Sequence, residues 1–213
     1  MAKLLNGIFG GFSGKLGSLI GSSWKKTAVV RKEQAKSSKP RSKATQDAID
    51  KFRYMAKWLV PFYPYVTQGF KFFAETRTEI NAAFSYNYKN SLRGEAPNFT
   101  IDYAFVMVSR GQLTNLLNVK AVLQDKNMLL LSWSIELKGK AYYNDQVMLV
   151  IYCPEIKDAT GMIGGINRSD GQLAFKLNEK FHGKALEVYV STYTINNKIV
   201  SDSAYLGRIE PAI

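Results

Sequence analysis

Residues 185–206 read ALEVYVSTYTINNKIVSDSAYL, and this stretch decides the fold class. Residues 185–195 and 198–206 are rich in β-branched and aromatic side chains, which favour extended structure. Asn196 and Asn197 lie between these segments, and asparagine is a common residue of tight turns. The stretch therefore predicts two neighbouring strands joined by a turn.

The same pattern extends upstream to Asn98, where the character of the sequence changes. Apolar residues alternate with others over residues 99–108, as in a strand. Seven strands within residues 98–213, separated by turn residues and without helical patterns, predict an antiparallel immunoglobulin-like β-sandwich. The expected strands are residues 99–108, 117–123, 128–137, 146–153, 173–177, 185–195 and 198–206.

A helical segment precedes the predicted sandwich. Ser42 is the expected N-cap of a first helix, and Pro61 is expected to end it near residue 60. The prolines of residues 61–65 (PFYPY) predict a rigid turn, whereas residues 69–73 (GFKFF) leave helix and strand open. The apolar face of this helix is expected to comprise Ile49, Phe52, Met55, Ala56 and Leu59.

A second helix is expected over residues 78–92, with Gly94 beyond its end. Its inward side chains are expected to be Ile80, Ala83 and Phe84. The chain therefore belongs to the α+β class. Its expected parts are a basic arm and linker over residues 1–43, a two-helix segment over 44–97 and a sandwich domain over 98–213.

Basic charge is concentrated at the start of the sequence. The chain has a net charge of +12, and residues 1–43 hold ten Lys and Arg residues against one acid, Glu33. Such an arm attracts phosphates or acidic protein surfaces, although a merely solvated tail has the same charge pattern. The expected phosphate contacts are Lys25, Lys26, Arg31, Lys32, Lys39, Arg41 and Lys43.

The basic arm also carries a glycine-rich pattern. Small and apolar residues alternate over residues 15–21, and residues 24–32 favour extended structure, so we expect a β-hairpin with its turn at residues 21–23. An isolated hairpin is barely stable in water, so this one needs a sheet edge or a neighbouring subunit. The expected assembly residues are Gly14, Lys15, Gly17, Gly21, Trp24, Val29 and Val30.

Catalytic and metal-binding constellations do not emerge from the sequence. His182 is the only histidine and lies in a turn context without a second ligand at metal spacing. Cys153 is the only cysteine, and its apolar surroundings predict a buried side chain. The glycines of residues 161–165 lack the Lys-Ser/Thr of a phosphate-binding loop. We therefore expect no enzymatic activity, no cofactor, no metal and no small-molecule substrate.

Composition indicates a folded chain. Hydrophobic residues make up 46% and charged residues 22% of the sequence, which excludes wholesale disorder. No apolar stretch approaches the length that spans a bilayer, so no membrane span is expected. The glycines among the first residues interrupt any signal-peptide pattern, which predicts a cytoplasmic product and leaves assembly into an exported or extracellular particle open.

Aromatic and basic residues interleave at residues 51–54, 57–58 and 70–73. Such a pattern can provide base stacking beside phosphate contacts. On a helix, however, the same residues form the two faces of an ordinary amphipathic element. No recognised nucleic-acid module matches the chain.

Five stretches of the sequence resemble a family of bacterial proteins classed only as a domain of unknown function. The family's usual linker has a Lys-Pro followed by the pattern Thr-x-x-Gln-x-x-x-Arg-x-x-Phe. This chain keeps the pattern only in part, because Asp50 or Lys51 replaces the arginine near Phe52. The resemblance covers most of the chain and implies an N-terminal arm, a helical segment and a C-terminal sandwich, without an assigned activity. The linker pattern is also similar to those of phage-like structural proteins. The stretches are GGFSGKLGSLIGSSWKK (10–26), VVRK (29–32), SSKPRSKATQDAIDKF (37–52), NFTIDYAFVMVSRGQL (98–113) and VSDSAYLG (200–207).

Together these patterns predict a non-enzymatic structural subunit. We expect it to form a homo-oligomer, as a filament, tube or shell, through strand pairing of its arm with a neighbouring subunit. Twelve Tyr and twelve Phe residues favour such contacts, because aromatic side chains are enriched at interfaces. The alternative is a nucleic-acid-binding or packaging protein that uses the basic arm.

Overall fold

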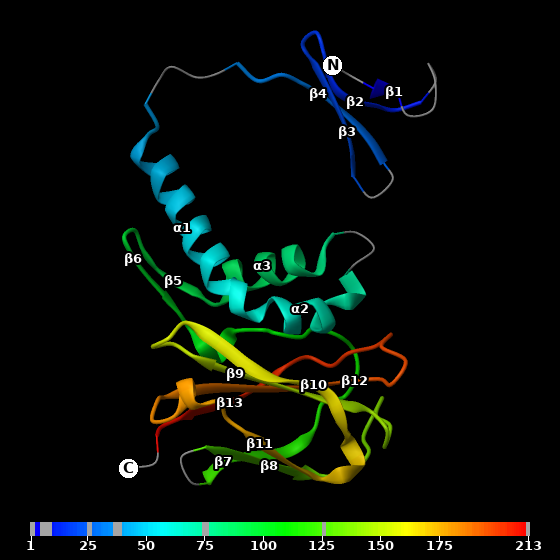
Figure 1. The fold of residues 1–213 in the computed structure, drawn as a ribbon, viewed down its shortest axis with the longest axis vertical. Coiled ribbons are helices and arrows are strands. Elements are labelled where there is room, and N and C mark those ends of the chain that lie inside the picture. The colour runs from blue at the N-terminus through cyan, green and yellow to red at the C-terminus, as the bar shows by residue number, and fades with distance from the viewer. Residues whose placement is uncertain are drawn as a thin grey trace. The chain divides into compact units, whose positions relative to one another are not determined.

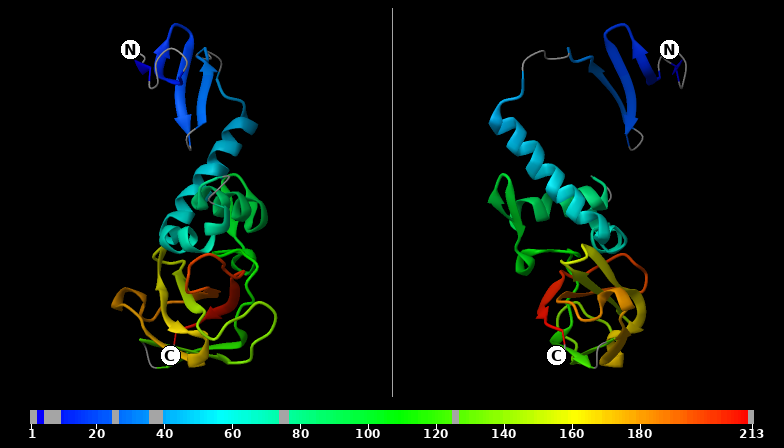
Figure 2. Two further views of the ribbon diagram at one scale, coloured as in Figure 1. Left: turned by 90° about the vertical axis from the view of Figure 1, so that its right-hand side faces the viewer. Right: turned by 60° about the vertical axis from the view of Figure 1, so that its left-hand side comes forward.

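The computed structural model describes residues 3–4, 10–24, 27–35, 40–73, 77–124 and 127–211. They belong to two compact units, Met1–Ser42 and Lys43–Ile213. The first unit consists of strands alone, whereas the second combines helices with sheets (Figures 1 and 2). No helix among the described residues is long and apolar enough to cross a membrane.

The first unit is a small antiparallel sheet in the order β1-β2-β3-β4. The turn predicted at residues 21–23 is wrong, because these residues lie inside β3. The chain turns instead at Gly17 and Ser18, where Gly17 has a φ of 58°, a left-handed conformation that favours glycine. The strands are β1 (Lys3–Leu4), β2 (Phe12–Leu16), β3 (Leu19–Trp24) and β4 (Thr27–Lys32).

The second unit begins with the predicted helices. The first is α1 (Lys43–Leu59) and the second is α3 (Glu79–Asn90), whose N-cap Thr78 accepts a hydrogen bond from the backbone N–H of Asn81 at 3.2 Å. The predicted apolar face of α1 is wrong at Phe52, because 56% of its surface is exposed; its ring contacts the ring of Phe84, with centroids 4.7 Å apart and planes inclined by 48°.

The rigid turn predicted over residues 61–65 is wrong. The chain continues as the 3₁₀ helix η1 (Val60–Phe62) and the helix α2 (Tyr63–Gly69), and then as η2 (Lys71–Phe73). Both prolines lie in the first turn of their helix. Proline is tolerated there because the missing N–H would have had no partner within the helix.

Two antiparallel sheets follow, in the orders β10-β9-β12-β13 and β11-β8-β7. A separate hairpin pairs β5 (Leu92–Glu95) with β6 (Asn98–Ile101). The predicted combination of helices with an antiparallel β-sandwich is therefore confirmed. The strands of the two sheets are β7 (Leu117–Gln124), β8 (Met128–Ser134), β9 (Gln146–Cys153), β10 (Asp158–Asn167), β11 (Gln172–Lys176), β12 (Leu186–Tyr193) and β13 (Ala204–Ile209).

The strand predicted over residues 99–108 is wrong beyond Ile101. The 3₁₀ helix η3 (Tyr103–Phe105) interrupts it. Met107 then exchanges two backbone hydrogen bonds, of 2.8 and 2.9 Å, with the buried side-chain amide of Asn87. The Asn87 amide thus makes the two hydrogen bonds that a neighbouring strand would make. For this reason the alternation of apolar residues continues to residue 108 although the backbone is not paired in a sheet there.

Two further strand predictions need correction. The strand β10 was not predicted, because its glycines are typical of a loop. In the structure, Gly164 and Gly165 lie at an irregularity in the β9–β10 register and have φ of 75° and 88°. The strand predicted over residues 198–206 begins only at Ala204. Upstream of it, the Thr194 hydroxyl accepts a hydrogen bond from the N–H of Ile199 at 3.1 Å and closes a loop.

The middle strands β9 and β12 are buried on both faces. Their sheet lies between the helices and the sheet of β7, β8 and β11 (Figure 1). On one side, Met148 and Tyr152 pack with residues of the three helices, and on the other, Leu149 and Val188 pack with residues of the second sheet. Two cores, one with the helices and one with the second sheet, therefore lie on opposite faces of the same two strands. For this reason residues 44–97 and 98–213, which the sequence pattern separates, lie in the same compact unit.

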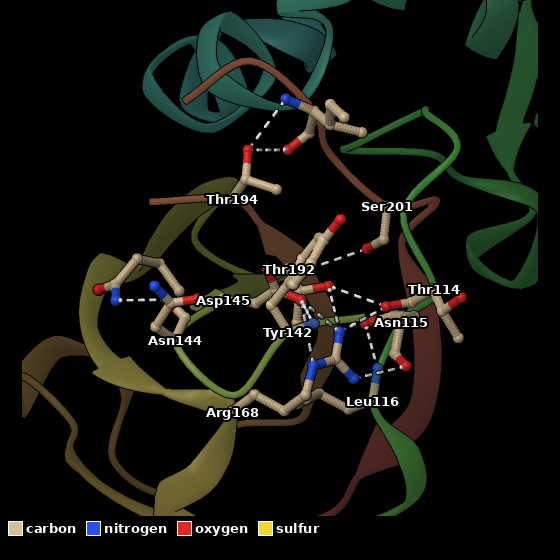
Figure 3. A network of polar contacts seen from close by, with 12 residues as sticks. Thr114, Asn115, Leu116, Tyr142, Asn144, Asp145, Arg168, Thr192, Thr194 and Ser201 are labelled. Atoms are coloured by element: carbon tan, nitrogen blue, oxygen red, sulfur yellow. Dashed lines mark hydrogen bonds and ion pairs between the residues drawn. The ribbon is translucent and has the colours of Figure 1, made fainter. Parts of the chain in front are cut away.

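A buried ion pair connects several loops to this core. The Arg168 guanidinium lies 3.3 Å from the Asp145 carboxylate, and each side chain is 1% exposed. Arg168 also donates to the carbonyl oxygens of Thr114 and Asn115 and to the hydroxyl of Thr192 (Figure 3). Burial lowers the pKa of Arg168, and Asp145 opposes this shift. The sequence pattern did not single out either residue.

Replacing Arg168 by methionine is expected to destabilise the protein by about 3–5 kcal/mol, because the Asp145 carboxylate then stays buried without its partner. Chemical denaturation followed by circular dichroism measures this destabilisation. Arg208→Met is the control, since Arg208 pairs with Glu210 at the surface and such pairs contribute about 1 kcal/mol or less. Equal destabilisation of the two variants would contradict the conclusion that the buried Arg168–Asp145 pair stabilises the second unit.

Candidate functional site

The described part of the first unit is a sheet whose apolar side chains form no hydrophobic core. Among its described residues, only Gly21 is buried. A sheet this small is stable in water only when an apolar face is covered. The larger apolar side chains are instead exposed, by 60% for Leu16, 42% for Leu19, 49% for Trp24, 43% for Val29 and 53% for Val30.

The strand register distributes these side chains over both faces of the sheet. Leu16 pairs with Leu19, and Val30 pairs with Gly21, which lies two residues after Leu19 in β3. Paired residues and residues two apart share a face, so Leu16, Leu19 and Val30 lie on one side. By the same rule Trp24 and Val29 lie on the opposite side. Neither face of the sheet is therefore purely polar.

Gly21 is the point of closest packing in this sheet. It pairs with Gly14 across the two strands. A Cβ atom at Gly21 would lie 2.2 Å from the carbonyl oxygen of Phe12 and 2.5 Å from its ring. The Phe12 ring therefore covers Gly21, and this position has room for glycine alone.

The basic residues of the arm are not all available for a ligand. Lys15 forms an ion pair with Glu33 at 2.6 Å. Arg31 and Lys32 are exposed neighbours in β4, so their side chains point to opposite faces. Of the remaining expected phosphate contacts, Arg41 precedes α1 and Lys43 is its first residue. Lys25, Lys26 and Lys39 lie outside the described residues.

The expected assembly residues Gly14, Lys15, Gly17, Gly21, Trp24, Val29 and Val30 all belong to this one sheet or its turn. The sequence analysis missed Leu16 and Leu19, which flank the Gly17-Ser18 turn as a cross-strand pair. A signal for them was present, because two apolar residues around a two-residue turn that contains glycine are typical of a hairpin.

The second unit places the remaining candidate residues in structural roles. Cys153 is fully buried and unpaired, as expected. A ring nitrogen of His182 lies 3.2 Å from the carbonyl oxygen of Leu177. Among the described residues, no group of three or more His, Cys, Asp or Glu side chains is arranged to hold a metal ion.

Solved structures that align with the chain share little of its sequence. The FN1–FN3 domains of chicken CNTN1 align with a TM-score of 0.38 and 7% identity, over 49% of this chain and 34% of theirs, so the chain spans about a third of that protein fragment. A computationally redesigned β-sandwich protein aligns with a TM-score of 0.35 and 11% identity, over 47% of this chain and 92% of its own.

Among curated proteins, none matches the sequence. The model of a family of unknown function, DUF6266, matches residues 11–207. This range includes most of the described strands of the first unit and nearly all of the second. The resemblance to a family without an assigned activity is therefore confirmed, and the chain belongs to the DUF6266 family.

Proposed function

We propose that the chain is a non-enzymatic structural subunit that self-assembles, and that the sheet of its first unit is the assembly element. The observation that carries this proposal is the exposure of large apolar side chains on both faces of that sheet, among whose described residues only Gly21 is buried. Covering these side chains removes apolar surface from water, which is the main favourable contribution to most protein association.

The distribution over two faces favours partners in other copies of the chain. A sheet with apolar side chains on both faces needs two covering surfaces. Docking on a single surface of its own second unit would leave one face exposed. Insertion between two neighbouring copies covers both, and repetition of that contact produces a filament, tube or shell.

Strand pairing offers a second contribution to the same contact. The strand β4 is the last in its sheet, so one of its edges has no partner strand among the described residues of the first unit. In the second unit, β7, β10, β11 and β13 end their sheets in the same way. Main-chain hydrogen bonds between such edges are a common mode of association. The ten residues 33–42 span up to about 35 Å when extended, which is enough to reach a neighbouring copy.

The basic charge of the arm supports a second candidate function, the binding or packaging of nucleic acid. Arg31 and Lys32 are exposed and have no ion-pair partner among the residues that the structure describes. Residues 1–43 together carry ten basic side chains against one acid. A subunit that both assembles and neutralises phosphates is physically consistent with these charges.

Polar substitutions on either face of the arm sheet are expected to stop assembly. The variants are Leu16→Ser with Leu19→Ser on one face, and Trp24→Ser with Val29→Ser on the other. Each pair leaves one face without its apolar contacts, so the mass measured by light scattering should fall to that of a monomer or a small oligomer. If only one pair has an effect, the sheet docks on one surface and the insertion between two copies is wrong.

A change at Gly21 tests whether the folded sheet is required. Gly21→Val places side-chain atoms where the Phe12 backbone lies, so neither the sheet nor the assembly should form. Gly17→Asn is the matched control, because nothing lies within 4 Å of a Cβ there and asparagine tolerates the left-handed conformation. Assembly that survives Gly21→Val would show that the sheet is dispensable.

The charge variant separates the two candidate functions. Replacing Lys25, Lys26, Arg31 and Lys32 by glutamine should leave assembly intact when apolar contacts drive it. If the arm also binds nucleic acid, the same change should weaken the affinity for DNA or RNA. The slope of log K against log salt should then become shallower by about 0.9 for each phosphate that the arm no longer neutralises. Fluorescence anisotropy with a labelled oligonucleotide at several salt concentrations measures this slope.

A further inference from the structure

A cavity of about 500 Å³ lies between the end of α1 and the turn that joins β9 to β10. This volume is in the range of small-molecule binding sites in proteins. Four aromatic side chains and two lysines contribute most of its lining, and they come from four different segments of the second unit. These residues are Tyr54, Lys57 and Trp58 of α1, Tyr103 of η3, Tyr152 of β9 and Lys157 of the turn.

One aromatic side chain of the cavity brings a buried hydrogen-bonding group without a partner. Trp58 is 9% exposed, and by donor–acceptor geometry its indole N–H has no hydrogen-bond partner among the described residues. Tyr54 is 37% exposed and Tyr103 is partly buried, so their hydroxyls line the more open part of the cavity. A buried donor left without an acceptor costs about 1–3 kcal/mol, which an acceptor on a ligand would recover.

The tyrosine hydroxyls remain protonated at neutral pH. Burial is the main cause that raises the pKa of Tyr103 to about 12, with smaller contributions from Glu187 and Tyr54. Burial likewise raises the pKa of Tyr152, and Tyr103 and Tyr54 raise it further. The ring centroids of Tyr103 and Tyr152 lie 5.9 Å apart, and both residues line the cavity together with Tyr54. Each protonated hydroxyl is a hydrogen-bond donor.

Positive charge at the cavity is not neutralised by the protein. Lys57 and Lys157 are exposed and have no ion-pair partner among the described residues. The acids next to Lys157 in the sequence are engaged elsewhere, since Glu155 pairs with Lys184 and Asp158 with Lys180. Two unpaired lysines disfavour a cationic ligand and favour an anionic one.

The backbone conformation of Lys157 is a further indication that the cavity is a binding site. Its φ is 53°, a left-handed conformation in which asparagine or glycine is more common. Departures from a low-energy backbone cluster at binding sites, where the surrounding structure compensates for them. A lysine at this position extends a charged side chain beside the cavity, which neither glycine nor asparagine would do.

We propose that this cavity binds a small organic anion in which a planar or apolar ring carries a carboxylate. The aromatic walls contact the ring, the two lysines attract the carboxylate, and the Trp58 indole and the tyrosine hydroxyls donate to its oxygen atoms. This site lies within the second unit and does not depend on the assembly proposed for the first.

Three probes of nearly equal shape test the proposal by isothermal titration calorimetry on the full chain. They are naphthalene-2-carboxylate, the neutral naphthalene-2-carboxamide and the cationic naphthalene-2-methylammonium. The carboxylate is expected to bind at least about tenfold more tightly than the amide, because one charge-assisted contact is worth about that factor, and the ammonium is expected not to bind. Equal affinity for all three, or no heat with any of them at several millimolar, overturns the proposal.

Two charge-matched variants locate the bound carboxylate. Lys57→Gln with Lys157→Gln should weaken its binding by about tenfold or more and leave the amide unaffected. Lys120→Gln with Lys198→Gln removes the same charge from exposed positions that do not line the cavity, and should change neither affinity. If the two double variants weaken the carboxylate equally, net charge and not this site attracts it, and the proposal is wrong.

The variant Trp58→Phe tests the donor that has no partner. It keeps an aromatic wall and removes the indole N–H, so it should weaken both the carboxylate and the amide, whose oxygen atoms accept from the same group. Because Trp58 packs in the core, Tyr54→Phe is a second donor variant at a more exposed position, with the same expected direction. Unchanged binding in both variants would contradict the assignment of these groups as donors.

Discussion

The double-sided burial of β9 and β12 is the constraint on which the second unit depends. Their side chains alternate between two cores, one shared with the helices and one shared with the second sheet. Neither layer alone can cover both faces, so helices and sandwich fold as one body. The cavity lies at one end of this arrangement, where the buried side chains of Tyr152, near the end of β9, and Trp58, from α1, both contribute to its lining. The same burial that stabilises the sheet thus positions the aromatic walls of the cavity.

The first unit presents the opposite situation. Its strands pair in a regular register, yet none of its described apolar side chains is buried and they occupy both faces. A sheet is stable in water when its apolar faces are covered. The sheets of the second unit meet this condition, and the described part of the first unit does not. Under the proposed function, other copies of the chain cover these apolar faces.

Much of the second unit could be predicted from local patterns. The strand β9 was predicted with its observed bounds, because its run of apolar residues has no glycine or proline to interrupt it. Predictions became wrong where a distant residue decides the structure. Asn87 of α3 substitutes for a strand partner of Met107, and no pattern within residues 99–108 indicates this. Similarly, the glycines of β10 suggest a loop, and only pairing with β9 makes them part of a strand.

The arm sheet and the cavity also differ in how far the sequence could predict them. Small and apolar residues indicated a hairpin in the arm, whereas the structure has a sheet whose register depends on the Gly17-Ser18 turn, and local propensity did not distinguish this turn from residues 21–23. The cavity could not be predicted, because Tyr54, Tyr103, Tyr152 and Lys157 are far apart in the sequence and meet only in the fold. Tyr54, Lys57 and Trp58 were visible in the sequence as part of a possible stacking site, whereas Tyr103, Tyr152 and Lys157 were not singled out.

The most direct test of the central claim is the absolute mass of the nuclease-treated full-length protein in solution, measured by light scattering at low and high salt. The account predicts particles many times heavier than the 23.9 kDa chain, and it predicts that they persist at high salt because apolar contacts hold them together. A mass of one chain at every salt concentration would contradict self-assembly through the arm sheet.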